Sequence, residues 1–190
     1  MTERIVGRFG ASALGLLLAV AGPAIAQEAV SPYAGEEGRT IKALSAEQIA
    51  DLEAGKGMGY AMAAELNHYP GPRHVLDMAD ALGLDAETIR KTEALFDAMQ
   101  TAARKFGERI IEAERQLDQA FVERTIAETR LTELTRRIAE LEGKLRNIHL
   151  AAHLEMTRLL TPEQIHAYDQ MRGYGGGETH EHDPSGHSEG

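Results

Sequence analysis

LTELTRRIAELEGKLRNIHLAAHLEMTRL, residues 131–159, carries the most regular pattern of the chain. Its apolar side chains recur at steps of three and four residues, which places them along one side of an α-helix. The positions between them hold mainly charged and polar residues, as is typical of a solvated outer face, and only Glu155 interrupts the apolar series. The pattern predicts a long amphipathic helix whose apolar stripe must be buried against another helix.

The same spacing occurs upstream, in Phe96, Met99, Ala103, Phe106, Ile110, Ala113, Leu117 and Ala120. The phase then continues through Arg124 to Leu131, and no glycine or proline lies between Gly107 and Gly143. Periodicity alone therefore allows a single rod of about 75 residues, roughly 110 Å long. The alternative is a hairpin that turns near 117–123, where Asp118 would cap a new helix.

A phrase of the type LxxExI occurs three times, as LSAEQI (44–49), LDAETI (84–89) and LTPEQI (160–165). Ser45, Asp85 and Thr161 are good N-cap residues, and the apolar residues before and after each cap can pack as a hydrophobic staple. The phrase therefore predicts helix starts and no catalytic group. The predicted helices cover 46–54, 58–67, 73–82, 86 to about 118, about 122 to 159, and 162–172.

The two ends of the chain differ from this helical centre. Residues 1–26 have a charged start, a short apolar run and an Ala24-Ile25-Ala26 cleavage site, which predicts a signal peptide and export to the bacterial periplasm. An uncleaved anchor is the alternative. Residues 27–43 are expected to be a flexible lead-in, 44–173 a helical domain, and 174–190 a disordered tail rich in His and acidic residues.

The composition restricts the partners. The chain has 190 residues and a formal net charge of −10, so a nucleic-acid partner is not expected, because its phosphates would be repelled. There is no cysteine, which excludes disulfides and thiolate metal sites. Any soft-metal chemistry must use His and Met.

His149 and His153 are the strongest candidates for a metal site. They lie one helical turn apart, with Met156 three residues further, so all three fall within a narrow arc of the helix. Two imidazoles and a thioether suit Cu, and imidazoles also suit Ni, Co or Zn. The alternative is that the two histidines are half-buried packing residues at the edge of the stripe. Glu155 is a candidate third ligand or the mark of a solvated groove.

Other histidines and methionines offer weaker sites. His68 and His74 flank a Pro-Gly-Pro loop and are expected to be exposed or to contribute ligands from a second segment. The row of Met58, Met62 and Leu66 favours core packing or a partner-binding face over a metal site. In the tail, His180, His182 and His187 stand among carboxylates, a composition that binds transition ions loosely or only keeps the tail soluble. No nucleophile triad, phosphate loop or HExxH helix occurs, so the chain is not expected to be an enzyme.

The segment HLAAHLEMTRLLTPEQIHAYDQMRGY (149–174), after a long amphipathic helix and a signal peptide, resembles the LTxxQ-motif Spy/CpxP family of periplasmic proteins, which includes heavy-metal resistance and sensor proteins. The resemblance covers about residues 73–174. Its sharpest element is Leu160, Thr161, Pro162, Glu163 and Gln164.

The resemblance implies an all-α fold: a long antiparallel helical hairpin is hooked by shorter helices, and two chains pair into a curved homodimer. It also implies a non-catalytic stress-response protein that binds heavy-metal ions in metal sensing or resistance. The alternative function is an ATP-independent chaperone that holds unfolded client proteins, or a restraint on a membrane-bound stress-signalling partner. No cofactor is required apart from the transition-metal ion of the first function. Because this chain is acidic, client capture would depend on apolar contact.

Overall fold

The computed structural model describes residues 31–174. The expected signal peptide (1–26), the first residues of the lead-in and the tail from residue 175 lie outside the described residues. The chain divides into two units, and the helices of the described residues all belong to the second, which begins at Gly35. Within the described part of this unit the fold is all-helical, with six α-helices, one short 3-10 helix (η1, Glu36–Gly38) and no strand. In this part of the chain, no helix is both long and apolar enough to span a membrane.

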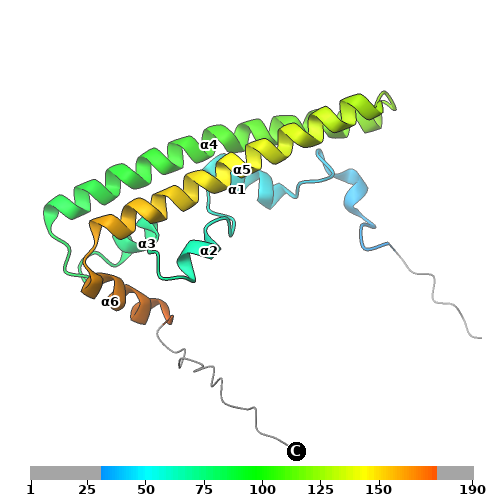
Figure 1. Cartoon of the computed structure of the whole chain (residues 1–190). Coiled ribbons are helices and arrows are strands. Elements are labelled where there is room, and N and C mark those ends of the chain that lie inside the picture. Colours follow the sequence, from blue (N-terminus) through cyan, green and yellow to red (C-terminus); the bar gives the residue numbers. More distant parts are fainter. Residues whose placement is uncertain (1–30, 175–190) are drawn as a thin grey trace, which may run out of the picture. The chain divides into compact units, whose positions relative to one another are not determined.

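Two long helices form the centre of the unit. α4 (Ala86–Val122) and α5 (Glu128–Leu159) lie side by side and make the most extensive helix contact (Figure 1). Residues 123–127 connect them in a non-helical turn with Arg124 at a φ of 55°. The uninterrupted rod allowed by periodicity is therefore wrong. The break lies later than expected.

Asp118 does not cap a helix, contrary to the sequence prediction. It lies inside α4, and its carboxylate accepts hydrogen bonds from the backbone N–H and the Nζ of Lys42, both at 3.3 Å. These contacts fasten the segment before α1 to α4. The neighbouring Ile41, which falls within the predicted flexible lead-in, is buried in the core. Part of the lead-in is thus packed structure.

The apolar stripes predicted from periodicity meet between α4 and α5. This first core consists of Ile41, Leu52, Ala103, Ile110, Ile111, Ala113, Ile138, Leu141 and Leu145. α1 (Ala46–Ala54) packs on α4, where Gly107 lies so close to Leu52 that any Cβ would overlap the Leu52 carbonyl group. Gly107 is therefore required by the approach of two helices.

Two of the short helices are as predicted. α6 (Pro162–Arg172) and α1 have the predicted bounds, and both capping boxes are formed, by Ser45 with Gln48 and by Thr161 with Gln164. The side chain of Gln164 also donates to the Leu82 carbonyl at 3.3 Å. The LTPEQ residues thus start a helix and tie it to the α3–α4 connection.

Two predicted helices are shorter than expected. The helix predicted at 58–67 is reduced to α2 (Met62–Glu65), because Met58 and Gly59 have positive φ values of 44° and 79°, which a helix does not allow. The helix predicted at 73–82 is α3 (Pro72–Asp77), followed by turns. α3, α5 and α6 surround a second core of Val75, Leu82, Met156, Leu160 and Tyr168.

Candidate functional site

A cavity of about 530 Å³ lies beside the C-terminal half of α5. Its wall is formed by the loop 55–61, α2, the start of α3, the middle of α4, and the end of the described chain at Arg172 and Tyr174. His149 and His153 of α5 both line it. The structure therefore brings the two predicted histidines to a single concave site.

His149 is buried, with 3% of its surface exposed, and its ring stacks on Tyr60 at 6.3 Å between ring centres. Its Nε2 atom is buried and has no hydrogen-bond partner. Burial, with a smaller contribution from His153, lowers the pKa of His149, so the ring is neutral near pH 7. Buried polar atoms are nearly always satisfied, and an unpartnered one points to a bound water or ion.

His153 is held in a defined orientation. Its Nδ1 lies 2.7 Å from the carbonyl oxygen of Tyr69, and since a carbonyl only accepts, Nδ1 must carry the proton. In the neutral ring the lone pair is then on Nε2. A hydrogen bond of this kind from one ring nitrogen is what orients a metal-binding histidine. The ring lies against Gly71, where a Cβ would come within 2.9 Å of Cε1 and 3.1 Å of Nε2. Only glycine leaves room for it.

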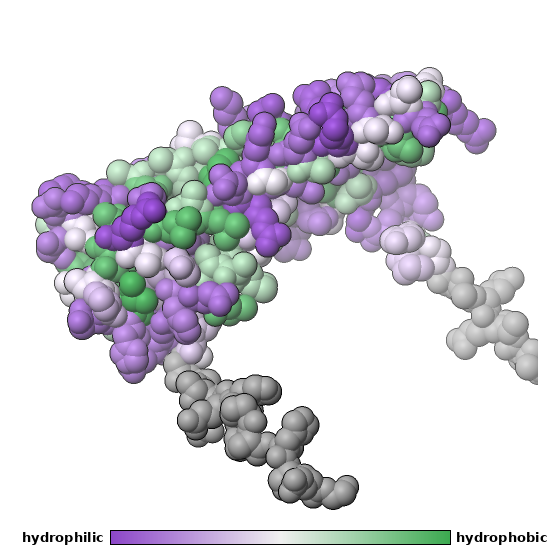
Figure 2. All heavy atoms as spheres, viewed as in Figure 1, coloured by the Kyte–Doolittle hydropathy of each residue, from purple (hydrophilic) through white to green (hydrophobic). Residues whose placement is uncertain are grey.

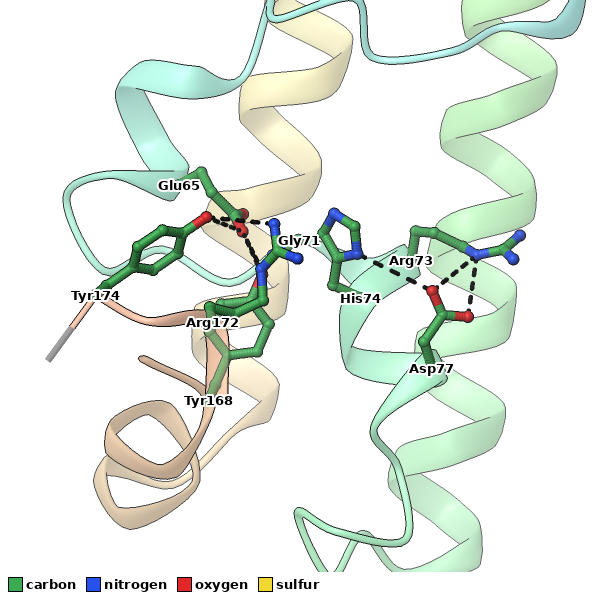
Figure 3. Close-up of polar contacts among 8 residues, drawn as sticks. All are labelled: Glu65, Gly71, Arg73, His74, Asp77, Tyr168, Arg172 and Tyr174. Carbon is green, nitrogen blue, oxygen red and sulfur yellow. Dashed lines mark hydrogen bonds and ion pairs between the residues drawn. The ribbon is translucent and has the colours of Figure 1, made fainter. Parts of the chain in front are cut away.

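Glu65 of α2 is the centre of a polar cluster at the edge of the cavity (Figure 3). Its Oε1 accepts hydrogen bonds from the Tyr168 hydroxyl at 2.6 Å, and from Arg172 Nε and the Tyr174 hydroxyl, both at 3.1 Å. Its Oε2 lies 3.7 Å from His153 Nδ1. Burial and the nearby Glu65 raise the pKa of Tyr168, so its hydroxyl stays protonated as a donor. Glu65 thus connects α2 to α6 and to His153.

The other predicted ligands lie elsewhere. Met156 is fully buried in the second core rather than at the cavity. Glu155 is exposed and pairs with Arg158 on the same helix. His180, His182 and His187 lie outside the described residues. Of the four predicted ligands within α5, only the two histidines reach the cavity.

The two histidines that flank the Pro-Gly-Pro loop lie in different surroundings. His74 lines the cavity, and its Nδ1 lies 4.0 Å from Asp77, a carboxylate that Arg73 also contacts (Figure 3). Partial burial and the charge of Arg172 lower the pKa of His74. His68 instead places its Nδ1 2.9 Å from the buried Asp169 of α6.

Sequence reasoning missed the roles of Glu65, Gly71, Tyr60 and Met99, all of which lie at the cavity or against its histidines. The HYPGP segment offered a partial signal, because a Pro-Gly-Pro turn between two histidines brings backbone close to a neighbouring element. The row of Met58, Met62 and Leu66 was expected in the core or on a partner-binding face. Core packing is wrong, because all three side chains are exposed, and they line the cavity.

Nitrogen and carboxylate donors alone do not complete a metal site here. Among residues 31–174, no group of three or more His, Asp or Glu side chains could hold a metal ion. Comparisons with models of protein families, with curated proteins and with solved structures found no match. What the site can bind follows from the donors that line the cavity.

Proposed function

We propose that this protein binds a transition-metal ion in the cavity, with His149 and His153 as the nitrogen ligands, and that it acts by binding rather than by catalysis. The observation that supports this most directly is the buried, unpartnered Nε2 of His149. A neutral imidazole with a free ring nitrogen is the form that ligates transition metals. His153, one turn away, has its Nε2 left free by the hydrogen bond to Tyr69.

The wider role follows from the resemblance to the Spy/CpxP family. In this proposal the chain is an exported periplasmic protein that serves metal sensing or resistance. α4 and α5 are the two arms of an antiparallel hairpin, hooked by the short helices, and two chains form a curved dimer. The contact between α4 and α5 and the position of LTPEQ at the start of α6 support this assignment.

Calorimetric titration with Cu, Ni, Co and Zn ions tests the proposal. The protein should be the mature chain with His180, His182 and His187 replaced by Ala, so that binding by the tail does not obscure the site. We expect saturable binding of at least one of these ions at micromolar concentration, lost when His149→Leu and His153→Leu are combined. His166→Leu is the matched control, because His166 is exposed on α6 and outside the cavity wall. Equal binding by the double variant and the control would refute the site.

A second function, the holding of unfolded clients, is favoured by apolar side chains at the cavity. Met62 is 59% exposed, and Leu66 and Tyr69 beside it are also exposed. On the face shown in Figure 2, hydrophobic residues gather over the part of the unit that carries α2 and α3, whereas the end near the α4–α5 connection is mainly hydrophilic. If this surface holds clients, Met62→Ser with Leu66→Ser should abolish the suppression of aggregation of a reduced, unfolded client. Unchanged suppression would exclude the surface.

A further inference from the structure

We infer that the cavity selects a soft monovalent ion, Cu(I), and that the thioethers of Met58, Met62 and Met99 complete its coordination by His149 and His153. This inference rests on the proposed metal site and deepens it by naming the class of ion. It starts from the composition of the cavity wall, which contains three of the seven methionines of the chain.

The three methionines reach the cavity from two parts of the chain. Met58, on the loop before α2, and Met62, the first residue of α2, are four residues apart, and Met99 lies in the N-terminal half of α4. The two histidines approach from α5. Soft thioethers are the ligands that favour Cu(I), and imidazole completes such sites readily. In a chain without cysteine, this is the softest donor set that can be assembled.

Oxygen donors that could complete a site for a divalent ion are scarce. Glu65 is the single carboxylate on the cavity wall, and its Oε1 is already occupied by three donors. Zinc sites normally have three or four protein ligands from Cys, His, Asp or Glu, and no such group of three occurs in the described chain. We therefore assign the remaining ligands to the thioethers on the cavity wall.

The charge of the wall also favours a monovalent ion. Lys56, Arg73 and Arg172 line the cavity beside the two histidines. Each is paired with a carboxylate, Asp51, Asp77 and Glu65 respectively, so these acids are engaged and are not free to compensate a metal charge. The paired wall therefore offers no net negative charge to offset an ion, and an ion of charge +1 needs less such compensation than an ion of charge +2.

The backbone at Met58 gives independent support. Met58 has a φ of 44°, in the left-handed region, and stands between Gly57 and Gly59. The left-handed conformation costs free energy for methionine but not for glycine. Residues held in such strained conformations are concentrated at functional sites. A thioether needed at the cavity would account for a methionine at this position, where glycine would form the turn without strain.

The methionines are also able to move onto an ion. Met58 and Met62 are partly exposed at the mouth of the cavity, and Met99 is half-buried. The volume of about 530 Å³ exceeds that of one ion, so the thioethers must close inward on binding. The unbranched methionine side chain, with three rotatable bonds, is suited to this adjustment.

The test is an anaerobic titration with Cu(I), in competition with a chromophoric Cu(I) chelator, using the mature chain without the three tail histidines. X-ray absorption at the copper edge reports sulfur ligation separately. Met58, Met62 and Met99 should be replaced together by Leu, which is close to Met in volume and preserves packing. Loss of a single outer-shell partner lowers metal affinity about 10–100-fold, so loss of these ligands should lower Cu(I) affinity by at least about 100-fold.

The control is Met171→Leu, because Met171 is exposed on α6 and does not line the cavity. It should leave Cu(I) affinity and the sulfur signal unchanged. Cu(I) bound equally by the triple variant, or bound without a sulfur signal, would overturn the inference. Binding of Ni, Co or Zn through the histidines without binding of Cu(I) would overturn it while the proposed function stands. Absence of binding of every ion would overturn both.

Discussion

The two buried regions of this protein differ in how they are stabilised. Between α4, α5 and α1, the first core consists of apolar residues only. Around the C-terminal half of α5, the buried positions include the polar residues Thr92, His149, His153 and Asp169. An apolar seam gains stability from each group that it removes from water, whereas buried polar groups cost free energy unless each finds a partner. The first region therefore stabilises the fold by apolar burial, whereas the second holds polar groups that need partners and includes the two histidines of the proposed site.

The largest effect should come from truncating a side chain in the first core. Leu145 is 1% exposed in the first core, and Leu154 on the same helix is 47% exposed. We expect Leu145→Ala to lower the free energy of unfolding by about 3 kcal/mol, because it removes buried methyl groups and leaves a cavity. Leu154→Ala should change it by less than about 0.5 kcal/mol. Urea unfolding followed by circular dichroism gives both values, and equal losses would show that the helices do not pack as described.

The second effect concerns two glycines inside the long helices. A Cβ at Gly107 would overlap the Leu52 carbonyl, whereas a Cβ at Gly143 meets nothing within 4 Å. We expect Gly107→Ala to destabilise the protein by about 2 kcal/mol, because α1 must move away from α4. Gly143→Ala should stabilise it by about 0.5–1 kcal/mol through helix propensity. Thermal unfolding shifts of opposite sign are expected. Shifts of the same sign would contradict the close approach of α1.

These two regions also differ in how far the sequence predicts them. The periodic apolar residues predicted α4 and α5, and the cap residues at Ser45 and Thr161 predicted the bounds of α1 and α6, because these signals are local. Local signals do not show which residues meet across the chain. The contact of Lys42 with Asp118 spans 76 positions, and nothing in either segment alone reveals it.

The same limit applies more strongly to the site. The spacing of His149 and His153 on one helix was sufficient to select them, since residues four apart share a face. Met156 was selected by a similar spacing and Glu155 as the one charge within the apolar series, but the packing of α6 buries Met156, and Glu155 faces solvent. Glu65 and Gly71 come from segments more than 75 residues away in sequence, so only the folded chain brings them to the histidines.

A smaller effect, of opposite sign, is expected at the site. His149→Leu removes the buried Nε2 that has no partner and replaces the ring with an apolar side chain. An unsatisfied buried polar group costs about 1–3 kcal/mol, so the variant should be more stable than the parent by about 1 kcal/mol in the absence of metal. Urea unfolding in the presence of a chelator measures this difference. A destabilised variant would show that His149 serves packing, as the alternative interpretation of the sequence has it.

The smallest effect is expected at a charged residue beside the first core. Glu114 of α4 is half-buried, and burial together with the charge of Glu142 raises its pKa. When folding raises the pKa of a carboxyl group, ionising that group costs the folded state free energy. This cost is absent at a pH below the pKa of the unfolded chain, and it is fully present once the pH has risen through the pKa of the folded state. Glu114→Gln should therefore stabilise the protein at pH 7 by a few tenths of a kcal/mol, a small value because solvent screens a half-exposed charge.

At pH 4, where the carboxyl group is largely protonated in both states, this gain should disappear. Glu112→Gln is the matched control on the same helix, because Glu112 is exposed and its pKa is lowered, chiefly by a hydrogen bond from Gln116. Glu112→Gln should destabilise the protein at pH 7, because it removes a negative charge that neighbouring groups stabilise. Opposite signs for two glutamates two residues apart follow only if α5 covers the side of α4 that carries Glu114. If both variants change stability in the same direction, both glutamates lie on the solvated face of α4, and the contact with α5 does not extend to Glu114.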